Sequence, residues 1–144
     1  MNVAQALKKK ARLVKEITDK WNIIHKHNSI IVGNPRKYNI REELENVERL
    51  MLELVELKEK IHKANQPVYH KIFRMSELKS QLKHLNSMNT TEGAEKDRYS
   101  TGTPTQYEVD IDEIFKNALI KLANDEIDLL QDELDYHNAT TQID

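Results

Sequence analysis

Apolar residues recur every three or four positions along most of the chain, and the clearest run lies between residues 39 and 65. In this run they occupy Ile40, Leu44, Val47, Met51, Leu54, Leu57, Ile61 and Ala64. This spacing places them on one side of an α-helix. Asn39, followed three residues later by Glu42, has the spacing of a capping box at a helix N-terminus. The pattern therefore predicts a long amphipathic helix over 39–65, which needs other helices to cover its apolar side.

The same periodicity predicts three more helices, and these cover residues 2–32, 67–88 and 110–136. Asn2 with Gln5 has the spacing of a helix start, and Asp110 with Glu113 opens the last helix in a similar way. The last helix carries apolar residues at Ile111, Ile114, Phe115, Ala118, Leu122, Ile127, Leu129, Leu130 and Leu134. Each of the four predicted helices therefore has an apolar side to bury.

The connections between the predicted helices fix how neighbouring helices are arranged. Gly33-Asn34-Pro35 is typical of a tight turn, so the helices over 2–32 and 39–65 should form a long antiparallel hairpin. Pro67 ends the second helix and suits the first turn of the third. We therefore expect an all-α fold, an elongated antiparallel bundle of four helices that forms one domain over 1–144.

Two polar segments remain outside the helices, a loop over 89–109 and a tail over 137–144. Loops of about 20 residues are uncommon in compact domains and are often functional. Alternating Thr and Tyr residues in its second half predict a short extended ribbon over 98–109. Arg36, Lys37, Tyr38 and Arg41 gather at the first turn, where they can hold an anion or simply solvate the surface.

The charged residues are distributed unevenly over a chain whose net charge is −2. Residues 1–38 hold nine Lys and Arg against two acidic residues, and residues 110–144 hold two Lys against ten acidic residues. A basic segment can bind nucleic acid, but the slightly acidic chain argues against a nucleic-acid partner. We expect instead that basic and acidic helices lie against each other, within one chain or between chains.

Composition excludes several classes of protein and of site. The chain has no cysteine, which excludes disulfides, thiolate metal sites and cysteine nucleophiles. Its longest apolar run, Ile30 to Val32, is far shorter than a membrane span, and the first residues lack a signal-peptide core. We therefore expect a cytoplasmic protein with no membrane contact.

No motif in the sequence provides catalytic or metal-binding chemistry. The six histidines form no H-E-x-x-H motif or comparable set of metal ligands, so we expect them on the surface. No nucleophile elbow, P-loop or dinucleotide-binding glycine motif occurs. The acidic pairs are explained by a helix cap and a solvated helix face. We therefore expect no enzyme activity, no cofactor and no metal.

Several short motifs follow one another along the chain. A Glu- and Leu-rich helix ends in I-x-x-x-N at Ile61 to Asn65, an arginine-bearing helix contains Arg74, a V-D-I step lies at Val109 to Ile111, and a terminal N-x-T-T-x-I lies at Asn138 to Ile143. In these motifs and their order, the chain resembles the septicolysin-like family of small bacterial and phage proteins over nearly its whole length. The resemblance implies a helical bundle that assembles into dimers or higher rings.

The polar loop, the third predicted helix and the tail supply candidate ligand-binding residues, namely Arg74, Arg98, Tyr99, Tyr107, Asn138 and Thr141. The N–H groups of an arginine guanidinium can donate paired hydrogen bonds to a phosphate group, and the face of a tyrosine ring can pack against a base or a ribose. We hypothesise that Arg74 and Arg98 bind phosphate, that Tyr99 and Tyr107 hold the base or ribose, and that the two tail residues close the pocket.

Two functions are compatible with these features. One is a non-catalytic, oligomeric binding protein that sequesters a small phosphorylated or nucleotide-derived ligand, such as an immune signal, in the manner of a phage sponge protein. The alternative is a structural or adaptor coiled-coil protein that acts through protein–protein contacts. In both cases the helices over 2–32 and 39–65 are too long for one chain to cover. We therefore expect a homodimer at least, or a hexamer built from dimers.

Overall fold

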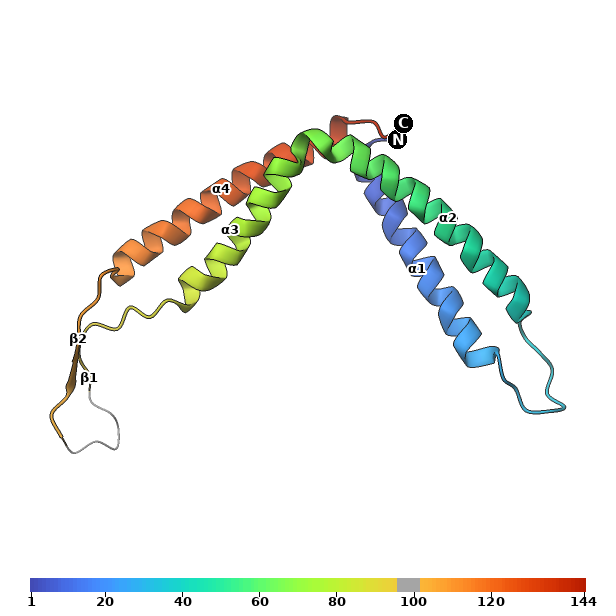
Figure 1. Ribbon diagram of the computed structural model, residues 1–144, viewed down its shortest axis with the longest axis horizontal. Coiled ribbons are helices and arrows are strands. Elements are labelled where there is room, and N and C mark those ends of the chain that lie inside the picture. The colour runs from blue at the N-terminus through green and yellow to red at the C-terminus, as the bar shows by residue number, and fades with distance from the viewer. Residues whose placement is uncertain (96–101) are drawn as a thin grey trace. The chain divides into compact units, whose positions relative to one another are not determined.

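The computed structural model describes residues 1–95 and 102–144, and most of them are helical (Figure 1). The elements, in chain order, are the helices α1 (Val3–His27) and α2 (Ile40–Asn65), the 3₁₀ turn η1 (Gln66–Val68), the helix α3 (Tyr69–Ser87), the strands β1 (Gly93–Glu95) and β2 (Thr105–Tyr107), and the helix α4 (Glu113–Thr140). The expected all-α class is confirmed at this level.

The chain divides into two compact units. Unit 1 contains Met1–Tyr69 together with Asp135–Asp144, and unit 2 contains His70–Leu134. Neither unit is by itself a bundle of four helices, because α1 and α2 lie in unit 1 whereas nearly all of α3 lies in unit 2. The single domain predicted over 1–144 stays a prediction.

Side-chain caps fix the N-termini of α1 and α2, as the sequence predicts. The Asn2 side chain accepts a hydrogen bond from the backbone N–H of Gln5 at 2.8 Å, and the Gln5 side chain accepts one from the N–H of Asn2 at 2.9 Å. Asn39 accepts a bond from the N–H of Glu42 at 3.2 Å. Each cap satisfies backbone donors that have no partner inside the helix.

Helix α1 ends at His27, so the predicted end near residue 32 is wrong. The Arg36 guanidinium donates to the carbonyl oxygens of His27 and Asn28, at 3.0 and 3.1 Å, and thereby caps the last turn. Two of the apolar residues that extended the predicted helix make little packing contact, since Ile31 is 75% and Val32 is 99% exposed. Gly33 then makes the turn with a φ of +92°, a left-handed conformation that glycine adopts without strain.

The second and third predicted helices are not separate. α2, η1 and α3 follow one another without a gap from Ile40 to Ser87, so the helical residues within 1–95 and 102–144 form three continuous runs. Pro67 lies at the start of the 3₁₀ turn, and its missing N–H removes one α-helical hydrogen bond. This loss is confined to the turn, and α3 begins directly after it at Tyr69.

The last helix runs from Glu113 to Thr140 and not from 110 to 136. Asp112 caps its start, because the Asp112 side chain accepts from the N–H of Phe115 at 2.8 Å. The small sheet consists of two antiparallel strands of three residues each, in which Gly93 pairs with Tyr107. The extended ribbon predicted over 98–109 is therefore present at 105–107, whereas its residues 98–101 lie outside the described part.

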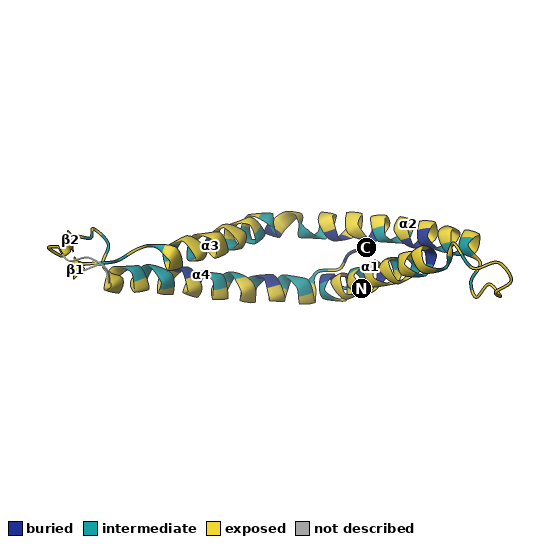
Figure 2. Ribbon diagram, turned by 90° about the horizontal axis from the view of Figure 1, so that it is seen from below, coloured by how far each residue is buried: buried dark blue, intermediate teal, exposed yellow. Residues whose placement is uncertain are grey.

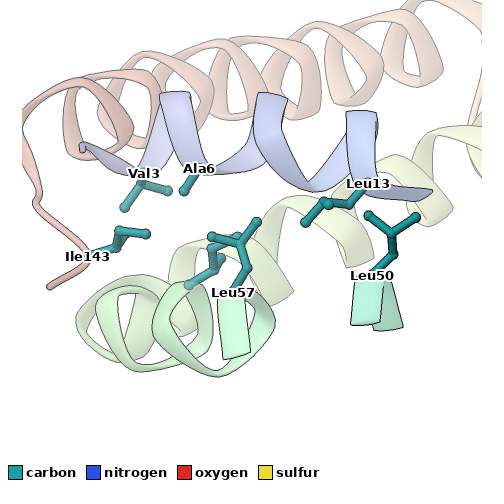
Figure 3. Packing of buried hydrophobic residues seen from close by; sticks show 7 residues of the cluster. Val3, Ala6, Leu13, Leu50, Leu57 and Ile143 are labelled. Atoms are coloured by element: carbon teal, nitrogen blue, oxygen red, sulfur yellow. The ribbon is translucent and has the colours of Figure 1, made fainter. Parts of the chain in front are cut away.

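The buried core of unit 1 lies between α1, α2 and the C-terminal tail (Figure 3). It consists of Val3, Ala6, Leu13, Leu50, Leu57, Ile61 and Ile143. The tail joins this core through the backbone, because the N–H of Val3 donates to the carbonyl of Thr141 at 2.9 Å. Buried positions are few beside the exposed ones along every helix (Figure 2).

Candidate interaction surface

Helix α1 leaves a regular row of apolar side chains exposed. Leu7, Val14 and Trp21 recur at intervals of seven residues, and each is between 37 and 45% exposed. A seven-residue interval returns to nearly the same side of a helix. The row is therefore distinct from the buried side of α1, which carries Leu13 and Ile24.

Helix α2 carries a matching row. Leu44 and Met51 are again seven residues apart, Val55 lies one turn further on, and all three are between 44 and 54% exposed. Two ion pairs fix the register between the helices, Lys9 with Glu53 at 2.9 Å and Lys20 with Glu43 at 2.8 Å. In this antiparallel register the two rows run along the same stretch of the hairpin.

The two rows lie on one side of the hairpin. Successive residues of an α-helix are rotated about the helix axis by about 100°. On both helices, the exposed row is rotated about this axis by roughly 100° from the buried row, in the direction in which the helix winds. Because α1 and α2 run in opposite directions, this offset turns both rows toward the same face. We call this surface the hairpin face and define it as Leu7, Ala11, Val14, Trp21, Leu44, Met51 and Val55.

Unit 2 carries a second exposed row, on α4. Phe115, Leu122 and Leu129 are again seven residues apart, and each is more than half exposed. We call this row the α4 stripe. The buried side of α4 carries Ala123 and Leu134 instead. The apolar residues that the sequence assigns to the last helix therefore divide between a buried side and an exposed one.

A basic hollow of about 770 Å³ lies at the loop between α1 and α2. Its cationic lining residues are Arg36, Lys37 and Arg41, and Tyr38 and Leu44 also line it. Arg36 is held by the end of α1, as described above. Lys37 and Arg41 make no salt bridge within the described residues. The hollow therefore offers positive charge beside the N-terminus of α2, where a helix dipole also favours an anion.

Arg74, predicted to bind phosphate, is engaged by a carboxylate. Its guanidinium donates two hydrogen bonds to Glu126, at 2.7 and 3.2 Å, and so links α3 to α4 within unit 2. These bonds and the attraction of the charges lower the pKa of the Glu126 carboxyl and raise the pKa of Arg74. The Arg74 guanidinium would therefore have to break its hydrogen bonds with Glu126 before it could bind a phosphate group.

The other predicted ligand residues that the structure describes are divided between the two units. Tyr107 is exposed on β2 in unit 2, and Arg98 and Tyr99 lie outside the described residues. Asn138 and Thr141 lie in unit 1. Thr141 has a structural role there, since its hydroxyl bonds with Nδ1 of His137 at 3.1 Å and its carbonyl accepts from Val3.

Two of the histidines expected on the surface take part in contacts between elements. His137 on α4 is half-buried and bonds through Nε2 with the Asn65 side chain at 3.2 Å. The hydroxyl of Tyr69 bonds with Nδ1 of His62 at 2.6 Å. His137 and Asn65 are 72 residues apart in sequence, so no local pattern indicated their contact. Among the described residues, no group of three His, Asp or Glu could hold a metal ion.

Comparisons of the chain with protein-family models, with curated proteins and with solved structures found no match. The resemblance to the septicolysin-like family therefore stays a prediction. Over the residues that the structure describes, no helix is both long enough and apolar enough to cross a membrane.

Proposed function

We propose that this protein is a non-catalytic helical scaffold that associates with copies of itself and works through protein–protein contacts. The observation that carries the proposal is the hairpin face, in which both helices leave large apolar side chains exposed at heptad spacing. Scattered exposed apolar residues need no explanation, but a contiguous apolar surface is typical of an interface. Heptad spacing on both helices is also the pattern by which helices pack against further helices.

Burial energetics favour covering this face. Moving a Val, Leu or Met side chain from water to a packed interior contributes about 1.5–3 kcal/mol, so a half-exposed one retains roughly 1 kcal/mol. An interface between two copies gains this free energy of burial from the side chains of both copies. The α4 stripe adds a second apolar surface, through which dimers can join into the higher assembly, up to a hexamer, that the sequence predicts.

Sedimentation equilibrium of the purified protein tests the proposal. At tens of micromolar we expect a mass of at least two chains, because association removes the hairpin face from water. Circular dichroism on the same sample checks that the helices are formed. A helical protein that sediments as a single chain over this whole concentration range contradicts the proposal.

The basic hollow favours a second candidate function, the sequestration of a small phosphorylated or nucleotide-derived ligand such as an immune signal. Lys37 and Arg41 supply positive charge with no competing salt bridge in the described residues, and Tyr38 supplies an aromatic face beside them. Arginine and lysine at a helix N-terminus are a common way to hold phosphate. In this candidate function, the residues proposed to bind phosphate are those of the loop between α1 and α2, in place of Arg74 and Arg98.

Calorimetric titration with inorganic pyrophosphate and with adenosine monophosphate tests this second function. We expect Arg41→Ala to weaken binding about tenfold to a hundredfold, since a hydrogen bond to a charged group contributes roughly 1.5–3 kcal/mol. Lys83→Ala, which removes a similar charge from α3, is the matched control and should bind like the parent. Arg98→Ala tests the loop that the sequence singles out. If neither probe binds the parent, or if Arg41→Ala binds equally well, the hollow is not the site.

A further inference from the structure

We infer that the hairpin face packs against the same face of a second copy, with α1 of each copy lying on α2 of the other and the two-fold axis running along the helices. This inference rests on the self-association proposed above and goes further, because it specifies which helices meet and in which register. The product is an antiparallel four-helix bundle made from two hairpins.

The exposed side of α1 has the alternation of sizes that such packing needs. Large residues at Leu7, Val14 and Trp21 are separated by the small residues Ala11 and Thr18, at steps of four and three. Small residues leave holes into which the large side chains of a facing helix can fit. The row therefore resembles one side of a helix–helix interface more than a surface for a small ligand.

Charge selects one of the two ways in which two hairpins can meet face to face. An axis across the helices would place α1 on α1, whereas an axis along the helices places α1 on α2. Helix α1 holds seven Lys and Arg against two acidic residues, and α2 holds five Lys and Arg against seven Glu. Pairing α1 with itself would bring like charges together, which is unfavourable in an interface. Pairing α1 with α2 brings opposite charges together.

The symmetry then fixes the register between the copies. Rotation about a two-fold axis parallel to the helices does not change the position of any residue along the length of the hairpin. Within one copy, the ion pairs of Lys9 and Lys20 with α2 place Lys15 level with Glu48. Lys15 is therefore also level with Glu48 of the second copy, and both side chains are exposed in the single chain. The two-fold repeats this charge pair on the other side of the bundle.

A charge-swap experiment tests this arrangement, with the dimer dissociation constant measured by sedimentation. We expect Lys15→Glu alone and Glu48→Lys alone each to weaken the dimer about tenfold, because each places like charges together at two symmetric positions. The double variant Lys15→Glu with Glu48→Lys should recover most of the parent affinity. Lys83→Glu on α3 makes the same change in net charge as Lys15→Glu and serves as the control, which should dimerise like the parent.

The outcomes separate this inference from the proposal on which it rests. If Lys15→Glu strengthens the dimer, α1 lies on α1 and the inferred arrangement is wrong. If the parent dimerises but neither single variant changes the affinity, the hairpin face is not paired in this register and the inference fails while self-association stands. If the parent itself is a single chain, the proposed self-association fails. Circular dichroism of every variant confirms that the helices persist when Lys15 loses its contact with Asp19.

Discussion

Replacing Met51 with aspartate is expected to convert the assembled protein into single helical chains. Met51 lies in the middle of the row on α2 and is 45% exposed, so the single chain tolerates a carboxylate there. An interface over the hairpin face would bury that carboxylate without a partner, once from each copy. An uncompensated buried charge costs about 3–5 kcal/mol, so the dissociation constant should rise at least about a hundredfold. Sedimentation equilibrium measures this change.

Two further variants show whether the effect belongs to the hairpin face. Val32→Asp introduces the same charge at an apolar residue that is 99% exposed in the loop, and it should leave the assembly unchanged. Leu129→Asp in the α4 stripe should leave the dimer intact and affect only a higher assembly. If Met51→Asp assembles like the parent while remaining helical, the hairpin face is not an interface.

Truncating Leu13 to alanine is expected to give the largest loss of folding stability. Leu13 is 5% exposed and lies in the cluster between α1, α2 and the tail. Removing a buried leucine side chain loses its transfer free energy and leaves a cavity, which together cost about 2–5 kcal/mol. Urea denaturation followed by circular dichroism should show this loss as a lower midpoint, without a change in the mass of the folded protein.

Its neighbour Val14 provides the matched control. Val14 is 45% exposed and lies in the hairpin face, one residue along the same helix. Val14→Ala should change the stability of the single chain little, since few packing contacts are lost, and it should weaken association instead. The stability of both variants is measured at a concentration at which the chains are separate. If the two truncations then cause equal losses of stability, Leu13 does not belong to a core from which Val14 is excluded.

Local sequence was sufficient for the helices themselves. Caps such as Asn2 with Gln5, and Asn39, act on backbone groups within three residues, so their effect can be recognised from spacing alone. The prediction that the chain associates also came from the sequence, where the apolar rows of the first two predicted helices are longer than one chain is expected to cover. The cations of the basic hollow were visible as neighbours in sequence, but nothing local distinguished an anion site from solvation.

Contacts between residues that are far apart along the chain could not be predicted from the sequence. Arg74 looks like a phosphate ligand by residue type, yet it is paired with Glu126, 52 residues away. Thr141 looks like a polar tail residue, yet its backbone is bonded to Val3 near the other end of the chain. In each case the contact depends on a partner that only the folded chain supplies, so residue type alone did not indicate it.

The sequence by itself determined that this chain is helical, where most of its helices begin, and that each of these helices carries an apolar side. Only the tertiary structure decided which apolar row is buried. Leu13 and Val14 fit helical periodicity equally well, because period 3.6 places apolar residues on a broad side of the helix without saying where on that side the partner lies. The packing of α1 against α2 and the C-terminal tail made that choice, because it buries Leu13 and leaves the hairpin face exposed.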